Sequence, residues 1–352
     1  MLLTARNVPL YLVGRGLMTS ESIVDGPVVV SDVSRRNRNF KVTRGEEPGF
    51  FVKQAARSDP ISIETVRRDA RCYWLATHEA EFAMLAPLLP RYHDFDVARS
   101  VLVTTLLDRA ETVYQLHLRL GAMPTDVAES LARAVAYYHV AFRTLPSSAT
   151  SRAFPRMAPW ILVSGDSTAL PPALLTPAGL ELLQLVRARG VERALAARRA
   201  TWRVETLMHG DLKWDNCLRV TGNAGASIRI VDWEIADVGD PAWDVGSILQ
   251  AYLAHSCFMT AAAAASSDSD RFRAAQPAMR AFWSTYVAAA HVADSGALLE
   301  RSTALAAARL VQTAYDSLYM SSTLTPSAVD LLEVAARLLS AGANAYRIIF
   351  GV

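Results

Sequence analysis

Residues 208–218 hold the side chains best suited to chemistry. Asp211 precedes Asn216 by five positions, so one tight loop carries both a carboxylate and an amide oxygen. A carboxylate can orient an acceptor hydroxyl and take its proton, and an amide oxygen can bind Mg²⁺, a hard cation that prefers oxygen ligands. Transfer of the γ-phosphoryl group of ATP needs these parts and few others. We therefore predict Asp211 as the base and Asn216 as a metal ligand of such a reaction.

A second carboxylate follows further along the chain. Asp232 comes directly after an apolar run that ends at Val231, so it should leave the end of a strand and point out of the sheet. There it could chelate metal between phosphates. Gly222 and Gly225 lie in the segment between the two motifs, as a hairpin turn requires. Asp232 is therefore the second predicted Mg²⁺ ligand.

The two motifs resemble those of the aminoglycoside phosphotransferase and choline kinase group, which are relatives of protein kinases. Residues 209–216 read His-Gly-Asp-Leu-x-x-x-Asn, and residues 232–234 read Asp-Trp-Glu. The resemblance implies that Asp211 is the catalytic base and that Asn216 and Asp232 bind Mg²⁺. It also implies a bilobal, protein-kinase-like α+β fold.

The resemblance extends over roughly residues 28–255. Residues 239–246 match the next block of that family, in which Asp244 would brace the catalytic loop from the following helix. His209 stands within the loop itself. We expect it to brace the loop by hydrogen bonding without having to transfer protons.

Lys213 stands two positions after the predicted base. Ser/Thr protein kinases also carry a lysine there, which contacts the transferring phosphate, whereas many antibiotic kinases have other residues. We count Lys213 with the catalytic residues. The alternative is a surface lysine beside Trp214.

Lys53 is the strand lysine that this group places against the α- and β-phosphates. An isolated strand lysine can also be a solvated edge residue. The family pairs this lysine with a helix glutamate, and Asp69 stands where that glutamate is expected. Because aspartate is one methylene shorter, we expect a longer or water-bridged pair, with Glu64 and Glu79 as competing partners.

The loop expected to cover the phosphates lacks Gly-x-Gly. Residues 34–42 are instead similar to the Ser-Asn-Arg-x-Tyr-x-Val pattern of many small-molecule kinases in this group. Backbone N–H groups and the side chains of Ser34 and Asn37 could bind phosphate oxygens there. Alternatively the loop is an exposed basic hairpin, or arginines such as Arg36 grip an anionic acceptor. Thr105, in the connector, should offer backbone hydrogen bonds to the purine.

The elements that must position these residues fall into two groups. Alternating apolar and polar residues predict a strand at 40–43, and short apolar or β-branched runs predict strands at 28–30, 50–53 and 100–107. Helical spacing predicts helices over 62–85, 125–142 and 176–203, with loops over 145–176 and 261–270. We expect a small antiparallel β-rich N-lobe at 1–107, which binds the nucleotide, and a larger α-helical C-lobe at 108–352.

Composition excludes several classes of protein. A formal net charge of +2 over 352 residues argues against a polyanion binder, so no nucleic acid partner is expected. Three widely spaced cysteines without a CxxC pair indicate neither disulfides nor zinc, and a reducing cytoplasm is the simplest compartment. No apolar run of membrane-spanning length occurs, so no membrane partner is expected either. We interpret the N-terminal residues as part of the fold and not as a signal peptide.

The acceptor is harder to predict. Residues 251–352 carry no acidic cluster, which argues against a cationic antibiotic or choline. The basic helix at 176–203 is either a solvated face or a docking surface for an acidic partner.

Residues 232–234 and 239–246 also resemble kinase-like proteins of actinobacterial lanthipeptide and thioamitide pathways. That implies a Ser/Thr acceptor in a precursor peptide, phosphorylated before elimination, and a pathway partner enzyme. The alternatives are a small-molecule hydroxyl kinase and a catalytically silent, nucleotide-binding protein that presents a peptide to another enzyme.

Overall fold

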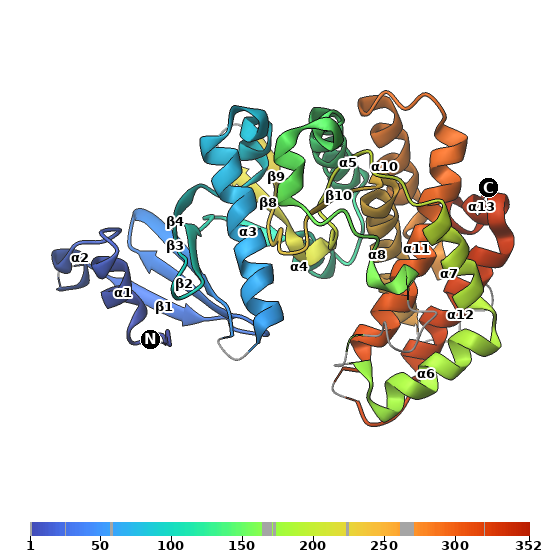
Figure 1. Ribbon diagram of the computed structural model, residues 1–352, viewed down its shortest axis with the longest axis horizontal. Coiled ribbons are helices and arrows are strands. Elements are labelled where there is room, and N and C mark those ends of the chain that lie inside the picture. The colour runs from blue at the N-terminus through green and yellow to red at the C-terminus, as the bar shows by residue number, and fades with distance from the viewer. Residues whose placement is uncertain are drawn as a thin grey trace. The chain divides into compact units, whose positions relative to one another are not determined.

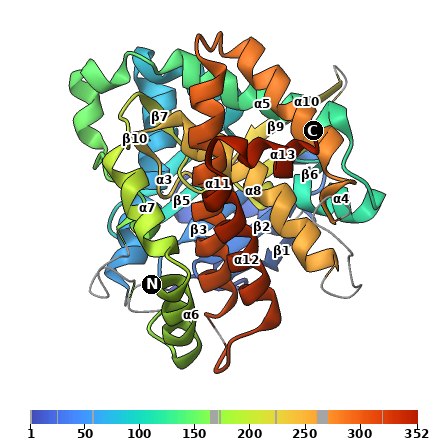
Figure 2. The same cartoon turned by 90° about the vertical axis from the view of Figure 1, so that its right-hand side faces the viewer.

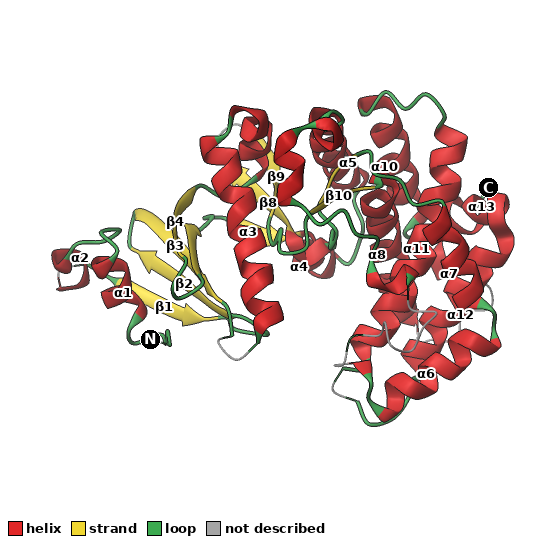
Figure 3. Ribbon diagram, in the orientation of Figure 1, coloured by secondary structure: helices red, strands yellow, loops and turns green. Residues whose placement is uncertain are grey.

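The chain folds into two compact units, which we describe separately. The first comprises Met1–Thr112 and Asn216–Ala236, and the second Val113–Asp215 and Asp237–Val352. The structure is a computed structural model (Figure 1), and Figure 3 shows its helices and strands. It describes residues 2–24, 26–56, 59–163, 171, 174–222, 225–260, 271–319 and 321–352.

The first unit is built on a five-stranded antiparallel sheet with the strand order β1-β2-β3-β5-β4. Its strands are β1 Val28–Asp32, β2 Arg38–Arg44, β3 Glu47–Gln54, β4 Tyr92–Asp96 and β5 Val101–Thr105. The four expected strands are confirmed, although β3 begins earlier than expected and leaves a turn of Gly45 and Glu46, with Gly45 at φ +58°. Strand β4 was not expected.

The two faces of this sheet have different neighbours. Successive strand residues point to opposite faces, and Phe40, Phe50 and Val52 belong to one buried cluster with helix α1, Val8–Gly14. The N-terminal residues are therefore part of the fold, as expected; α2, Ser20–Val24, follows α1. Lys53, one residue beyond Val52, faces the opposite side of the sheet, toward helix α3.

Helix α3 spans Pro60–His78 and starts at Asp59, whose side chain accepts a hydrogen bond from the Ile61 N–H. The expected single helix to residue 85 is wrong beyond His78. Glu79 is extended, and the chain continues as a 3₁₀ helix at Ala80–Leu88 that contains Pro87. Proline lacks an N–H and disfavours α conformation in the residue before it, so this segment cannot extend α3.

A three-stranded sheet completes the first unit, with β6 Ala110–Thr112, β8 Cys217–Gly222 and β9 Gly225–Ile230 in the order β6-β8-β9. The expected hairpin is confirmed by the pairing of Gly222 with Gly225; the two residues between them lie outside the described residues. Because β6 pairs with β8, residues 216–236 cluster with the N-terminal part of the chain, whereas we had placed them in the C-lobe. The lobe boundary at 107 stays a prediction.

The second unit is mainly helical. Its α-helices are α4 Val113–Leu120, α5 Thr125–Ala141, α6 Pro177–Ala188, α7 Val191–Ala200, α8 Pro241–Thr260, α10 Gln276–Ala289, α11 Ser295–Ser317, α12 Pro326–Ala341 and α13 Ala345–Phe350. Helix α11 packs against both α8 and α12, and Figure 2 shows α11 and α12 side by side. A two-stranded sheet, β7 Thr206–Met208 with β10 Asp237–Gly239, lies at the start of the loop over residues 209–216. None of the described helices is long and apolar enough to cross a membrane.

The expected helix over 176–203 is two helices. The chain breaks at Gly190, which has φ +69° and separates α6 from α7. Three arginines of this region form ion pairs with glutamates: Arg187–Glu192, Arg189–Glu333 and Arg198–Glu300. These arginines are therefore paired within the unit and do not form an unpaired basic face.

The first expected loop contains short helical segments, and its residues 164–170, 172 and 173 lie outside the described residues. The stretch 145–176 contains short 3₁₀ helices at Leu145–Ser147, Ala149–Ala153 and Trp160–Leu162. The expected loop at 261–270 lies outside the described residues.

Candidate active site

In the first unit, Lys53 is buried among three carboxylates. Its Nζ donates to Asp69 Oδ2 at 2.8 Å and to Asp232 Oδ1, and it lies 3.4 Å from Glu234 Oε2. Burial alone would lower the pKa of Lys53, but the three carboxylates outweigh it and hold the pKa well above its usual value. Lys53 is thus a buried, charged residue, and the interpretation of it as a solvated edge residue is excluded.

Asp69 joins two segments of this unit. Its Oδ2 accepts from Lys53, and its Oδ1 accepts from the Trp233 N–H at 2.9 Å. The Lys53–Asp69 pair is therefore direct, and the expectation of a longer or water-bridged pair is wrong. The competing Glu64 and Glu79 are both exposed.

Asp232 occupies a turn just after β9. Its φ of +69° is left-handed, a conformation in which non-glycine residues are uncommon and which occurs often at functional sites. The Val231 N–H donates to the Asn216 carbonyl at 2.9 Å, so the two predicted metal-ligand residues belong to adjacent backbone segments. This turn also directs Glu234 to Lys53.

The chemistry of these donors fits Mg²⁺. Three carboxylates share Lys53, so negative charge is in excess, and the Asn216 amide adds a neutral oxygen. Within the described ranges, no three His, Cys, Asp or Glu side chains are placed to hold a metal together. Mg²⁺ commonly binds through one or two protein ligands plus water and substrate phosphates. Asp232 with Asn216 meets that requirement.

The predicted phosphate-covering loop is tied to its surroundings. The Ser34 hydroxyl accepts from the Asn39 N–H at 3.1 Å, which fixes the turn. Asn37 is buried; its Oδ1 accepts from the Ser62 hydroxyl at 2.5 Å and its Nδ2 donates to Glu234 at 3.3 Å. Arg36 is half exposed and also reaches Glu234, at 3.5 Å. The loop is therefore anchored to α3 and to Glu234 and is not a free basic hairpin.

The Thr105 backbone N–H is already engaged. It donates to the Arg91 carbonyl at 2.9 Å, and the Leu106 N–H donates to the Gly49 carbonyl at the same distance. A purine contact through either N–H would break these bonds. The contact at Thr105 stays a prediction.

In the second unit, two cations hold the predicted base. Lys213 Nζ donates to Asp211 Oδ2 at 2.6 Å, and Arg309 Nη2 donates to Asp211 Oδ1 at 2.9 Å. Burial would raise the pKa of Asp211, but Lys213 and Arg309 outweigh it and hold the pKa far below its usual range. Asp211 is therefore an ionised carboxylate of low basicity.

Asp244 braces the loop, as expected. It is fully buried, and its two oxygens accept from the backbone N–H groups of His209 at 2.7 Å and Gly210 at 3.0 Å. Its Oδ2 also accepts from the Tyr138 hydroxyl at 2.6 Å. Gly210 has φ +85°, which side-chain-bearing residues rarely adopt.

His209 and His139 both serve this brace. His209 Nδ1 lies 3.3 Å from the Asp211 N–H and accepts its hydrogen bond, so the bracing expected of His209 is confirmed. His139 is buried and lies 3.3 Å from Asp244. The hydrogen-bonding contacts of His209 and His139 account for their positions without a role in proton transfer.

A cluster of aromatic side chains packs around Trp214, in the loop over residues 209–216. His117 is buried, its ring centroid is 4.3 Å from that of Trp214, and Tyr252 packs against both. Neither His117 nitrogen has a hydrogen-bond partner among the residues that the structure describes. Burial lowers the pKa of His117 to about 4, so the ring is neutral near pH 7.

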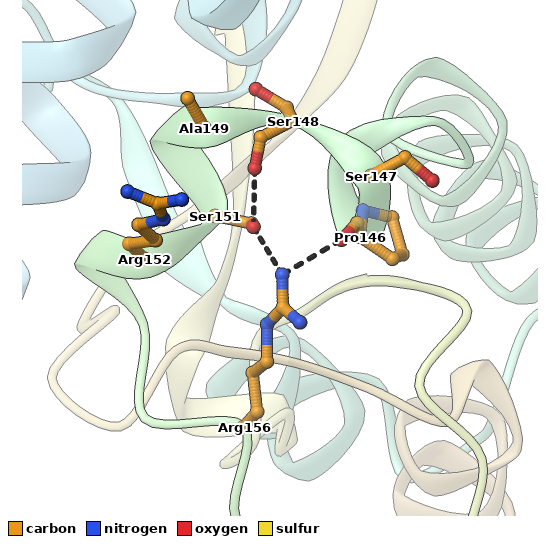
Figure 4. Close-up of a pocket in the computed structure, with 7 residues that line it drawn as sticks. All are labelled: Pro146, Ser147, Ser148, Ala149, Ser151, Arg152 and Arg156. Atoms are coloured by element: carbon orange, nitrogen blue, oxygen red, sulfur yellow. Dashed lines mark hydrogen bonds between the residues drawn. The ribbon is translucent and has the colours of Figure 1, made fainter.

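A surface cavity of about 410 Å³ lies elsewhere in this unit (Figure 4). The Arg156 guanidinium crosses it and donates to the Pro146 carbonyl at 2.7 Å and to the Ser151 hydroxyl. The Arg156 N–H donates to Asp237 at 2.6 Å. None of the predicted site residues lines this cavity.

Sequence reasoning missed two residues of the site. Glu234 was visible beside Asp232, but its direction depends on the left-handed turn at Asp232. Arg309 lies 98 positions from Asp211, on a helix whose neighbouring residues are apolar, so no local pattern marked it.

Comparison with known proteins identifies relatives at the level of family and fold. Residues 31–284 match the sequence pattern described as the phosphotransferase enzyme family. A search of curated proteins found no match.

Solved structures resemble this one at low sequence identity. Choline kinase LicA from Streptococcus pneumoniae is 14% identical with a TM-score of 0.54, and the match covers 95% of this chain and 99% of that one. An ethanolamine kinase of Plasmodium vivax is 12% identical with a TM-score of 0.57, covering 97% and 89%. The GDP complex of wild-type aminoglycoside 2'-phosphotransferase-IIIa is 13% identical with a TM-score of 0.52, covering 94% and 98%.

These matches confirm two expectations. The fold is α+β and kinase-like, with an antiparallel β-sheet toward the N-terminus and helices toward the C-terminus. The family match confirms an ATP-dependent phosphotransferase that acts on hydroxyl groups with Mg²⁺.

Proposed function

This chain belongs to the phosphotransferase enzyme family, and on that premise we propose that it transfers the γ-phosphoryl group of ATP to a hydroxyl group of a neutral or anionic small molecule. The observation that carries the proposal is the pairing of Asp211 with two cations, Lys213 and Arg309. Asp211 is the group that meets the acceptor hydroxyl. The charges around Asp211 therefore bear directly on which acceptor it receives.

Asp211 orients the acceptor hydroxyl and takes its proton. Because two cations reduce its basicity, orientation is the larger part of its role and the proton leaves late. This order suits a loose transition state, in which the bond between the acceptor oxygen and phosphorus is little formed and the hydroxyl still holds its proton. Lys213 stabilises the transferring phosphoryl group, and His209 holds the loop.

The first unit supplies the donor half of the reaction. Lys53 contacts the α- and β-phosphates, and Asp69 positions it. Asn216 and Asp232 would hold Mg²⁺, which would neutralise phosphate charge when bound. Four further residues complete the donor half of the proposal, covering the phosphates and contacting the purine: Ser34, Arg36, Asn37 and Thr105.

The charged side chains around Asp211 favour some acceptor charges over others. Choline, ethanolamine and kanamycin, named for similar structures, are cationic. The positive charges of Lys213 and Arg309 match the negative charges of Asp211 and Asp316, so these four groups leave no excess negative charge to attract a cationic acceptor. A neutral or anionic acceptor fits this balance.

A Ser/Thr residue of a precursor peptide in natural-product biosynthesis is the second candidate acceptor. Lys213 favours it, because Ser/Thr protein kinases carry a lysine at this position and here it binds the base directly. Such a reaction would involve a partner enzyme that eliminates the phosphate. The third candidate is a silent protein that binds nucleotide and presents a peptide.

The test is turnover with Mg²⁺-ATP and a panel of hydroxyl acceptors: cationic, neutral, anionic and a Ser/Thr peptide. ADP release and mass spectrometry of the acceptor report transfer. Asp211→Ala should lower turnover by roughly 10²–10⁴-fold while leaving Mg²⁺-ATP affinity unchanged. The exposed Asp126, on α5, provides the matched control Asp126→Ala.

Two results would contradict the proposal. Wild-type turnover in Asp211→Ala would remove Asp211 from the reaction. Tight ATP binding without ADP release, for every acceptor, would favour the silent protein.

A further inference from the structure

We propose that Arg309 is a positioning residue for phosphoryl transfer: from helix α11 it holds one oxygen of Asp211 while Lys213 holds the other. The inference rests on the proposed function of Asp211. It assigns a role to a residue far from the catalytic loop in sequence.

The geometry around Asp211 carries the proposal. Arg309 Nη2 binds Oδ1 at 2.9 Å and Lys213 Nζ binds Oδ2 at 2.6 Å. Rotation of the carboxylate about its Cβ–Cγ bond would break both charge-assisted bonds. A carboxylate oxygen has two lone pairs, so the bonds to Arg309 and Lys213 do not by themselves exclude an acceptor hydroxyl.

Arg309 is the more rigid of the two cations. Its side chain is 4% exposed, whereas that of Lys213 is 44% exposed. The guanidinium carbon lies 5.5 Å from the centre of the Trp243 ring, and Trp243 Nε1 donates to the Gly210 carbonyl at 2.6 Å. The Arg309 guanidinium, the Trp243 indole and the Gly210 backbone thus restrain one another's positions.

A purely stabilising role accounts poorly for Arg309. Its Nε and Nη1 are buried and have no hydrogen-bond partner in the part of the chain that the structure describes. Buried donors without partners destabilise a fold, and arginine usually uses several of its five donors when it is buried. Among the described residues, the partner to which Arg309 donates is Asp211.

Charged and titratable groups of the loop and of α11 act on Asp211. Lys213 and His209 come from the loop itself, and Arg309 and Asp316 from α11. Removing Arg309 leaves a largely buried carboxylate with Lys213 as the neighbouring cation among these groups. Asp211 then takes up a proton at higher pH than in the wild type.

Turnover of three variants tests the proposal, each compared with the wild type at pH 8 and pH 5.5. Arg309→Met removes the charge and keeps the apolar stem. It should lower kcat by about 10- to 100-fold at pH 8 while leaving the KM for Mg²⁺-ATP unchanged. The ratio of turnover at pH 5.5 to that at pH 8 should also fall several-fold.

Arg309→Lys is the conservative control, because it keeps the charge without the planar fork. It should restore the pH ratio and part of kcat. If Arg309→Met does not fold, Arg309→Gln, which keeps a donor without the charge, replaces it with the same expected results.

The outcomes separate this inference from the proposed function. Loss of turnover in Asp211→Ala together with wild-type kcat and pH ratio in Arg309→Met overturns the inference alone. A kcat that falls equally at both pH values and is not restored by lysine shows a structural role, and also overturns it. A fall in the pH ratio that lysine restores supports it.

Discussion

Replacing Asp244 by alanine should destabilise the second unit more than most single substitutions would. The carboxylate is fully buried and accepts hydrogen bonds from two backbone N–H groups of the catalytic loop and from the Tyr138 hydroxyl. Burial would raise its pKa, but His139 and these donors outweigh burial and lower it, so the native state holds the ionised form. Alanine leaves three buried donors without an acceptor.

The expected loss follows from those three donors. Each unsatisfied buried donor costs about 1–3 kcal/mol, and breaking a buried charged network costs about 3–5 kcal/mol. We therefore expect a loss of about 4 kcal/mol in the free energy of unfolding, which corresponds to a fall of roughly 8–16 °C in Tm at about 2–4 °C per kcal/mol. Asp244→Asn keeps one acceptor oxygen and should cost about half as much.

The assay is thermal unfolding without nucleotide, followed by circular dichroism and by calorimetry. Glu181→Ala, at an exposed position of α6 in the same unit, is the control and should change stability by less than about 0.5 kcal/mol. An Asp244→Ala protein that melts together with this control would refute the reasoning. It would show that the loop amides find other acceptors.

Two further predictions concern metal binding and pH. Asp232→Ala should abolish Mg²⁺-ATP binding measured by calorimetry, whereas Glu64→Gln, at an exposed position of α3, should not; unchanged affinity in Asp232→Ala would remove it from the metal site. Burial lowers the pKa of His117 to about 4 in the folded protein. As pH falls, the unfolded chain therefore takes up a proton on His117 at a higher pH than the folded protein does. The wild type should accordingly lose stability between about pH 6.5 and pH 4. His117→Phe, which keeps the ring, should remove about 2 kcal/mol of that loss between pH 7 and pH 4.5 in urea unfolding, and an identical pH dependence in both proteins would contradict it.

The sequence predicted the parts of this site that depend on local patterns. An apolar run after a turn placed Lys53 on a strand, helical spacing placed Asp69 on the following helix, and the glycines at 222 and 225 marked the hairpin before Asp232. These features are set by neighbours within a few residues. Local periodicity was therefore sufficient to predict them.

Other features depend on tertiary packing. Trp74, on α3, is apolar in type but is 42% exposed and stacks on His78. Arg309 became a neighbour of Asp211 only through the packing of α11 on α8. Sequence spacing carries no information about such pairs.

The two bonds of Asp69 bear on how this enzyme could be regulated. In protein kinases, movement of the helix that carries the lysine partner switches activity. Here the same carboxylate also holds the Trp233 N–H, beside the turn of Asp232. Displacing α3 would therefore release Lys53 and the turn that carries the proposed metal ligand Asp232 together, and would break two buried charge-assisted bonds. A helix that moves away from the sheet is thus a poor on–off switch for this chain.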